Sequence, residues 1–163
     1  MPANFPERRL TGDAHTQHVK ELLIERAWNV CRRGQEVFGQ EMVTALQGTR
    51  STTNHEPDLL AVRGCRVAEI ECKTTLSESG RRYVKLDQLD VQRPLAAVRG
   101  AILYYVFADL VAVTGDAVLE AVQRAGRRYR VRPGDAVEVP ETYGRRFDSV
   151  FGDPVPGQLR FSA

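Results

Sequence analysis

Cysteine is scarce in this chain, and its three copies are not arranged to bind a metal or to staple the fold. Cys31, Cys65 and Cys72 are odd in number, and no two of them form a C-x-x-C pair. We therefore expect no zinc ribbon, iron–sulfur cluster or disulfide framework. Cys65 and Cys72 instead fit the role of small apolar residues in strands.

Long hydrophobic runs are also missing. No apolar stretch approaches the roughly 18 residues that a membrane-spanning helix requires. The first segment, 1–13, lacks the apolar core of a secretory signal peptide. These two absences predict a cytoplasmic protein with no membrane partner.

Lysine is the scarcest charged residue. It occurs only at Lys20, Lys73 and Lys85, so arginine supplies 20 of the 23 basic residues. Arginine forks suit phosphate oxygens, but GC-rich coding or a thermophilic host produces the same bias. Because the net charge is only +2, bulk charge does not by itself indicate a nucleic-acid partner.

Length and composition are those of one α/β domain. At 163 residues with 42% hydrophobic residues, the chain is long enough to bury a core of its own. Apolar patterns predict helices over 16–33, 85–98 and 116–125, strands over 42–46, 101–107, 128–131 and 136–139, and a hairpin over 57–74. This order predicts a mixed β-sheet flanked by helices. Residues 1–14 are expected to be loose, and the segment from Tyr143 to be irregular.

The hairpin carries the most informative residues. An apolar run that follows Asp58 and a second one that ends in Glu71-x-Lys73 flank a turn at Gly64. Side chains alternate along a strand, so Glu71 and Lys73 project from one face. Glu69 shares that face, where it can either touch a metal or, as the favoured expectation, pair with an arginine. A hairpin folded near Gly64 brings Asp58 close to Glu71.

Two carboxylates beside a main-chain carbonyl offer the hard oxygen ligands that Mg²⁺ prefers. Asp58, Glu71 and the carbonyl of Cys72 therefore form a candidate metal site, which Mn²⁺ can also fill. A metal held there activates a water and neutralises phosphate charge, and Lys73 orients or deprotonates that water or stabilises the phosphate. The pattern predicts a metal-dependent phosphodiesterase, although an isolated Glu-x-Lys is more often a solvated strand face.

The acid–acid–lysine pattern resembles the motif of the PD-(D/E)xK nuclease superfamily, present here as Pro57-Asp58 and then Glu71-Cys72-Lys73. Within that superfamily, the chain is similar to the archaeal-type Holliday junction resolvases, which keep the same interval of thirteen residues between the two acids. The resemblance implies a restriction-endonuclease-like fold.

Two further segments carry the likeness to the resolvases. Arg50-Ser51 lies eight residues before the aspartate, where those enzymes keep an Arg-Ser pair. The segment 83–88 is similar to their Tyr-Val step into the helix after the Glu-x-Lys strand. The resemblance covers residues 15–108, the expected nuclease core, and leaves 109–163 as a C-terminal extension of unassigned role.

The first helix adds a weaker likeness. Glu25-Arg26 is similar to a Glu-Arg pair of the resolvases, in which the glutamate belongs to the metal site. The interval from Glu25 to Arg50 is longer than in the family pattern, which implies an insertion around 34–48. Glu21 therefore stays a rival for the helix carboxylate.

The resemblance implies a site, a substrate and an assembly. It assigns catalysis to Asp58, Glu71, Lys73 and Glu25 (or Glu21). The metal, Mg²⁺ or Mn²⁺, is assigned to Asp58, Glu71, Glu25 and the carbonyl of Cys72. The resemblance also implies DNA contacts from Arg26, Arg50, Ser51, Lys85 and Gln88. The expected protein is a homodimer that makes paired symmetric nicks in four-way DNA junctions, in the nucleoid or in a phage-infected cell.

Alternatives stay open for the function and for single residues. The same site serves a restriction-type or repair nuclease that acts on duplexes, flaps or ends. A catalytically idle DNA-binding module on this fold is the third alternative, although such a module has no need of two converging carboxylates. Gln88 is equally explained as a solvent-facing helix residue. The arginines of 124–132 either extend the DNA-binding surface or form a solvated basic face.

Overall fold

A mixed β-sheet lies at the centre of the computed structural model, which describes residues 5–34, 40–47, 55–74, 80–125 and 135–155. The strands are β1 (Asn29–Arg32), β2 (Leu59–Arg63), β3 (Arg66–Lys73), β4 (Arg82–Lys85), β5 (Ile102–Phe107), β6 (Val111–Thr114), β7 (Ala136–Val139) and β8 (Arg145–Arg146). The helices are α1 (Phe5–Glu25), α2 (Gln40–Gln47), α3 (Leu86–Val98), α4 (Gly115–Arg124) and α5 (Phe147–Phe151), with a 3₁₀ turn, η3, at Glu141–Tyr143.

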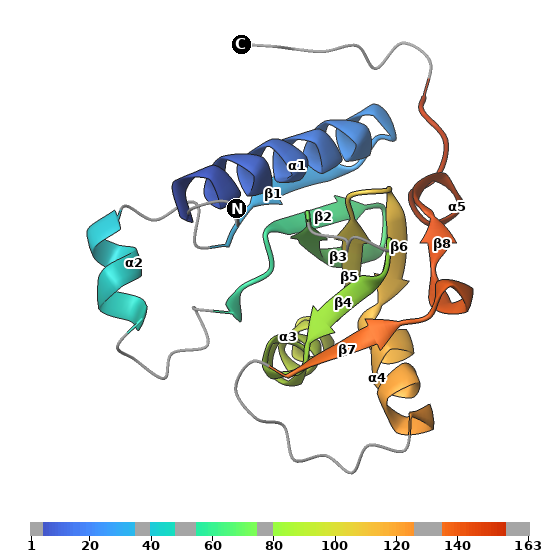
Figure 1. Ribbon diagram of the computed structural model, residues 1–163. Helices are drawn as coiled ribbons and strands as arrows, with labels where there is room; N and C mark the ends of the chain where they lie inside the picture. Colours follow the sequence, from blue (N-terminus) through green and yellow to red (C-terminus); the bar gives the residue numbers. More distant parts are fainter. Residues whose placement is uncertain (1–4, 35–39, 48–54, 75–79, 126–134, 156–163) are drawn as a thin grey trace.

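Six strands form the main sheet in the order β1-β2-β3-β5-β6-β8, and β4 pairs with β7 in a separate two-stranded sheet (Figure 1). The neighbours β3 and β5 run parallel, whereas the other neighbouring strands of the main sheet run antiparallel. The predicted mixed sheet flanked by helices is therefore confirmed.

The main sheet buries an apolar core on each of its faces. One core joins α1 and α5 to the sheet and includes Leu23, Tyr104 and Phe151. The other joins α3, α4 and the β4–β7 pair to the opposite face and includes Leu89 and Tyr105. The adjacent residues Tyr104 and Tyr105 serve different cores because side chains alternate along β5. The predicted buried strand at 101–107 is thus confirmed.

The predicted hairpin is confirmed as β2 and β3, joined by a tight turn. Gly64 in that turn has φ +58, a left-handed conformation that glycine adopts without strain. Leu59 pairs with Ile70 at the far end of the hairpin. The next pair outward, by continuation of this register, is Asp58 opposite Glu71.

The first predicted helix is wrong at both ends. The helix α1 already begins at Phe5, so residues 5–14 are helical rather than loose. It ends at Glu25, because Ala27 takes a left-handed φ of 61° that a continuous helix does not allow. Trp28 then turns into the core, and its indole Nε1 donates to the carbonyl of Phe151 at 2.9 Å. The residues that follow form the edge strand β1 instead of the end of a helix.

Two short segments also differ from their predictions. Residues 42–46 lie in the helix α2 rather than in a strand. This segment is rich in good helix formers, and Met42 is 53% exposed, so no sheet buries an alternating face there. The strand predicted over 128–131 lies outside the described residues, whereas β7 confirms the strand over 136–139.

Residues 145–151, in the segment that was predicted to be irregular, form regular structure. They form β8, which pairs with β6, and then α5. Phe151 of α5 packs against the rings of Trp28, Tyr104 and Phe147 with centroid distances of 5.7, 5.2 and 4.6 Å. The C-terminal part of the chain therefore completes the core beneath α1.

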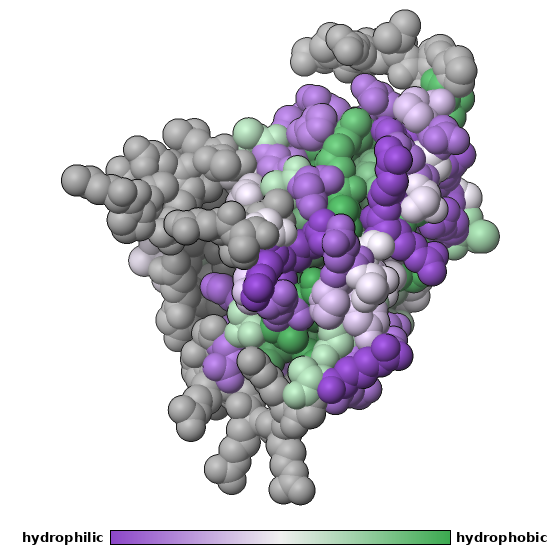
Figure 2. All heavy atoms as spheres, turned by 45° about the vertical axis from the view of Figure 1, so that its right-hand side comes forward, coloured by the Kyte–Doolittle hydropathy of each residue, from purple (hydrophilic) through white to green (hydrophobic). Residues whose placement is uncertain are grey.

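Most polar residues lie outside the two apolar cores, as one face of the surface shows. On the face turned forward in Figure 2, most described residues are hydrophilic, and hydrophobic residues show mainly as a narrow band between them. Among the described helices, none combines the length and the apolar character needed to cross a membrane.

Candidate active site

Four neighbouring strands align one residue each in a row across the sheet. The main-chain N–H of Arg33 donates to the carbonyl of Asp58 at 2.7 Å, which extends the β1–β2 pairing by one residue. Asp58 lies opposite Glu71 by register, and Glu71 pairs with Tyr105 across β3 and β5. Directly opposed residues project from the same face. The row therefore lies on the face of the sheet that α3 covers.

Asp58 is held by main-chain groups. Its Oδ2 accepts a hydrogen bond from the N–H of Cys72 at 2.7 Å, which ties the start of β2 to the end of β3. Gly34 lies against the same carboxylate with φ +34. A Cβ at Gly34 would lie 3.2 Å from Oδ1 of Asp58 and 3.3 Å from its Cα. The glycine thus leaves the space in which this carboxylate sits.

Glu71 and Lys73 meet on the predicted shared face. The Nζ of Lys73 lies 2.7 Å from Oε1 of Glu71 and donates to Oε1 of Gln88 at 2.7 Å. The side chains of Glu71 and Lys73 are 10% and 18% exposed. The pair is therefore sheltered but still reachable from solvent. Gln88 comes from the first turn of α3 and, contrary to its alternative explanation, faces the site.

Gln92 and Tyr105 complete the surroundings of Glu71 and were not predicted. The Nε2 of Gln92 donates to Oε2 of Glu71 at 2.9 Å, and the hydroxyl of Tyr105 donates to Oε1 of Gln92 at 3.1 Å. Gln92 lies four residues after Gln88, so both share one face of α3. That spacing was the sequence signal available, whereas Tyr105 was predicted only as part of the strand over 101–107.

A network of two acids and two arginines braces the loop that precedes Asp58. Arg99, at the end of α3, donates to Oε1 of Glu69 at 2.8 Å and to Oε1 of Glu56 at 2.7 Å. Arg33 approaches the same two acids at 3.4 and 3.5 Å. The hydrogen bond from Arg99 holds the pKa of Glu56 below its usual value, with Arg33 adding to the effect. The predicted pairing of Glu69 with arginine is confirmed.

The structure does not bring the candidate helix carboxylates to Asp58 and Glu71. Glu25 is the last residue of α1, and three residues later Trp28 lies beside Arg66 at the start of β3 (5.1 Å). That is the opposite end of β3 from Glu71. Glu21 is exposed and accepts from Gln17 at 2.9 Å.

Arg26, predicted to bind DNA, is buried in the fold. It donates to Asp148 at 2.6 Å and to the carbonyl of Leu22 at 2.7 Å, and it lies over the ring of Phe147 (5.2 Å). Its exposed fraction is 6%. The arginine therefore fastens α5 to α1, far along the sheet from the acids of the site.

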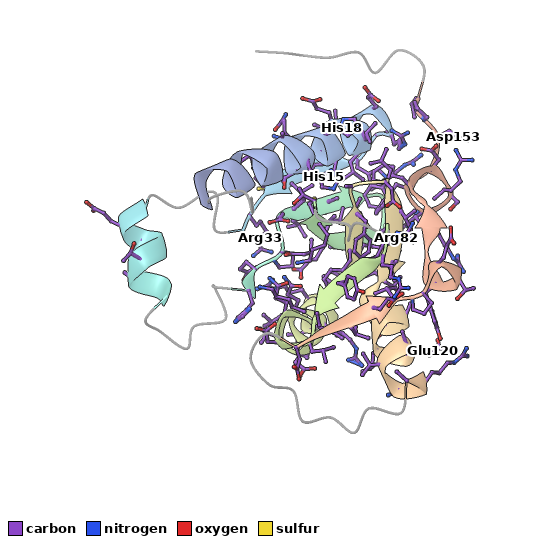
Figure 3. The ribbon with its side chains drawn as sticks, viewed as in Figure 1. His15, His18, Arg33, Arg82, Glu120 and Asp153 are labelled. Carbon is purple, nitrogen blue, oxygen red and sulfur yellow. The ribbon has the colours of Figure 1, made fainter. Side chains whose placement is uncertain are left out.

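The earlier half of α1 lies at the level of the site instead. The Nε2 of His15 lies 3.2 Å from the carbonyl oxygen of Val106, the residue that pairs with Cys72. Burial lowers the pKa of His15 from its ordinary 6.5, and the nearby His18 lowers it further. Figure 3 marks His15, His18 and Arg33 along this side of the molecule. At 1.5 Å per residue, Glu25 lies ~15 Å further along the helix than His15.

Three further residues were predicted to contact DNA: Lys85, Arg50 and Ser51. Lys85 is exposed at the end of β4 and immediately precedes α3, so it lies close to Gln88 in the chain. Arg50 and Ser51 lie outside the described residues.

The donor set of the site fits a hard divalent cation. Asp58 and Glu71 supply two carboxylates, and the main chain of Cys72 runs directly beside them. Mg²⁺ is typically held by one or two carboxylates while water and phosphate oxygens fill its other positions. No group of three His, Cys, Asp or Glu side chains converges within the parts of the chain that the structure describes, so no third such ligand joins them there.

The mixed sheet, with an acid before β2 and Glu-x-Lys at the end of β3, defines a restriction-endonuclease-like fold. Among solved structures, the chain is similar to Hjc from Archaeoglobus fulgidus, a Holliday junction resolvase from an archaeal hyperthermophile, with a TM-score of 0.57. The two share 16% sequence identity over 86% of this chain and 95% of the other. The likeness predicted from the sequence is confirmed at the level of the fold. No protein-family profile and no curated protein matches the chain.

Proposed function

We propose that this protein is a Mg²⁺-dependent endonuclease that resolves four-way DNA junctions. The observation that carries the proposal is the convergence of Asp58, Glu71 and Lys73 at one end of the β2–β3 hairpin. The fold similarity to an archaeal junction resolvase supports the choice of substrate. Mn²⁺, which favours similar oxygen ligands, is expected to replace Mg²⁺.

Each residue of the site has a chemical task in this proposal. Asp58 and Glu71 present carboxylate oxygens to the metal, which when bound lowers the pKa of a water and neutralises charge on the phosphate. Lys73 orients that water or stabilises the charge on the phosphate oxygens. Gln88 keeps the ammonium group of Lys73 in place through its amide oxygen. Glu25 and Glu21 are left out of this set because of their positions.

The DNA contacts and the assembly belong to the same proposal. Lys85 lies beside the start of α3, where it can meet the backbone of the strand that is cut, and Arg50-Ser51 keeps its predicted role there. We propose a homodimer of single-domain chains, because a two-fold axis places two identical sites on opposite strands of a junction. Recognition then rests on branched shape and phosphates inside the cell, with little reading of bases.

The test is cleavage of a synthetic four-way junction with Mg²⁺. Asp58→Asn and Glu71→Gln should each lower nicking by more than about a hundredfold, since even outer partners of a metal site cost 10- to 100-fold. Glu120→Gln is the matched control, because it removes an exposed carboxylate of α4 that pairs with Arg124. Activity that survives both site substitutions would show that the site is assigned wrongly.

A linear duplex in the same assay separates the proposal from its alternatives. A resolvase should bind and cut the junction in preference to the duplex, and should leave symmetric nicks. Equal binding to both substrates would favour a restriction-type or repair nuclease. Junction binding without any Mg²⁺- or Mn²⁺-dependent cleavage would favour the idle DNA-binding module.

A further inference from the structure

We infer that Gln92 and Tyr105 are positioning residues that hold Glu71 so that only one of its carboxylate oxygens is presented to the metal. The inference rests on the proposed function, since it concerns the same metal site. Neither residue belongs to the acid–acid–lysine motif, and both come from elements that the motif does not include, α3 and β5.

The geometry is a short chain of buried polar groups. The hydroxyl of Tyr105 donates to Oε1 of Gln92 (3.1 Å), and Nε2 of Gln92 donates to Oε2 of Glu71 (2.9 Å). Tyr105 is 0% exposed and Gln92 is 1% exposed. Polar groups buried this deeply need their partners, because water does not replace a lost one.

Only one orientation of the Gln92 side-chain amide satisfies both hydrogen bonds. Tyr105 donates through its hydroxyl hydrogen, so the amide of Gln92 must turn its oxygen toward Tyr105 and its NH₂ toward Glu71. The opposite amide orientation would set an oxygen against the carboxylate. A tyrosine hydroxyl carries its proton at neutral pH, so it is the donor in this pair.

The two oxygens of Glu71 therefore have unequal partners. Oε2 is bound to Gln92, which is packed inside the core, whereas Oε1 is bound to Lys73 at 2.7 Å. The side chain of Lys73 is 18% exposed, so a cation that enters from solvent can displace its ammonium group from Oε1 while the hydrogen bond to Gln88 keeps Lys73 beside the site. Gln92 cannot move in this way, so Oε1 is the oxygen that Glu71 offers to a metal.

A purely structural role for Gln92 predicts a different result from a positioning role. If the amide only fills the core, its removal should lower the stability of the protein and leave metal affinity alone. If it positions Glu71, its removal should weaken metal binding even in the folded protein. Partners that orient a metal ligand typically change metal affinity by 10- to 100-fold.

The experiment is a calorimetric titration of the DNA-free, full-length protein with Mn²⁺, alongside the Mn²⁺ concentration that gives half-maximal junction nicking. Gln92→Leu should weaken Mn²⁺ binding by about 10- to 100-fold. The Mn²⁺ concentration that gives half-maximal nicking should rise by the same factor.

Tyr105→Phe removes a single hydroxyl and tests the chain without disturbing the packing. It should weaken Mn²⁺ binding in the same direction as Gln92→Leu, by a smaller factor. Tyr104→Phe is the matched control, because this neighbour on β5 faces the other core and packs on Phe151. Its Mn²⁺ affinity should equal that of the unmodified protein. If Gln92→Leu fails to fold, the comparison of the two Tyr→Phe variants decides the question.

The outcomes separate this inference from the proposed function. If the unmodified protein binds Mn²⁺ and nicks junctions, but Gln92→Leu and Tyr105→Phe bind Mn²⁺ equally well, the positioning role is overturned and the proposed function stands. If the unmodified protein binds no Mn²⁺, both are overturned. Weaker Mn²⁺ binding in Tyr105→Phe than in Tyr104→Phe supports the positioning role.

Discussion

The ammonium group of Lys73 neutralises the negative charge of Glu71 in the absence of metal and substrate. Both oxygens of this sheltered carboxylate are bonded, one to Lys73 and one to the neutral amide of Gln92. Among the residues that the structure describes, Lys73 is the one cation that balances its negative charge at contact distance. A partly buried carboxylate that loses its cation is costly, and a divalent ion can then take the place of the ammonium group.

Lys73→Met should therefore separate stability from activity. Without metal, the free energy of unfolding should fall by about 1–3 kcal/mol, because Glu71 keeps its charge and loses its partner. Mn²⁺ should restore stability by more than it does in the unmodified protein, since it binds the folded state in place of the lysine. Junction nicking should drop by about 10²- to 10⁴-fold.

Thermal unfolding with and without Mn²⁺ measures both effects of Lys73→Met. Lys20→Met, a lysine on α1, is the control and should change neither the stability gain nor the nicking rate. An equal gain from Mn²⁺ in Lys73→Met and in the unmodified protein would contradict competition between the lysine and the metal.

His15 gives the fold a pH dependence near neutrality. Its pKa is lowered in the folded protein, chiefly by burial, so the unfolded chain binds a proton more readily as the pH falls through 6.5. The stability present above that pH should therefore decrease toward pH 5. The acid Glu56 titrates lower, because its pKa is reduced from 4.5. Its contribution is lost only below that value, outside this window.

Chemical unfolding at pH 7.5 and 5.5 tests the role of His15. The unmodified protein should be less stable at the lower pH, and His15→Gln should reduce this difference. His55→Gln removes a histidine that precedes the motif aspartate and should leave the difference as it was. A pH response that is the same in His15→Gln and in the unmodified protein would contradict the prediction.

The sequence predicted residues well where strand geometry alone decides their position. The shared face of Glu71 and Lys73 follows from the two-residue repeat of a strand, and both meet in the structure. Asp58 followed from the hairpin register. Gln92 was missed because its role depends on the tilt and rotation of α3 over the sheet. Those quantities depend on packing between distant segments, which periodicity does not contain.

Among the elements, the end of β1 has a direct effect on the site. Gly34 takes a left-handed φ of +34, and a Cβ added to it would lie 3.2 Å from Oδ1 of Asp58. Gly64, in the hairpin turn, has a similar left-handed φ of +58 but no atom within 4 Å of its Cβ position. Replacing either glycine by alanine therefore strains the backbone. Only the replacement at Gly34 also places a methyl group against Asp58.

Gly34→Ala and Gly64→Ala form a matched pair of variants. Each should lower the free energy of unfolding by about 1 kcal/mol, the usual cost of a left-handed alanine. Only Gly34→Ala should weaken Mn²⁺ binding and slow nicking, because its methyl group displaces the Asp58 carboxylate. Denaturant titration and the junction assay measure the two quantities. Equal nicking by the two variants would show that Asp58 tolerates the added methyl group.

Element prediction failed where a tertiary contact overrode a local pattern. Val30 and Cys31 fit the apolar face of the predicted first helix, yet they lie in β1. The left-handed Ala27 and the burial of Trp28 against Phe151 end α1 early. Phe151 lies more than a hundred residues later in the chain. A window of local sequence therefore does not reveal why the helix stops there.

At the scale of the whole molecule, the two faces of the main sheet have different roles. The core beneath α1 and α5 stabilises the sheet, and the opposite face carries the site between β3 and α3. The segment 109–163, unassigned from the sequence, contributes to both cores through α4, β7 and α5. The structural likeness to Hjc also extends over 86% of the chain, beyond the range 15–108 of the sequence likeness. The C-terminal part is thus built into the fold.

The proposed homodimer needs a surface that joins two copies away from the catalytic residues. Val98 and Ile102 are 87% and 51% exposed, and they flank the short connection between α3 and β5. This connection lies at the start of β5, whereas Lys73 pairs with Phe107 at its other end. Exposed large apolar side chains can mark a contact between proteins, and we propose these two as part of the dimer surface.

The double substitution Val98→Asp with Ile102→Asp should therefore convert a dimer into monomers. Sedimentation at micromolar concentration should give twice the mass of one chain for the unmodified protein and the mass of one chain for the variant. Each monomer keeps its own Asp58, Glu71 and Lys73, so Mn²⁺ affinity should stay unchanged. Paired nicking of one junction should be lost, because the second strand then waits for an independent binding event.

Ile24→Asp, at an exposed apolar position on α1, is the control and should remain dimeric. An unmodified protein that sediments as a monomer would overturn the proposed assembly.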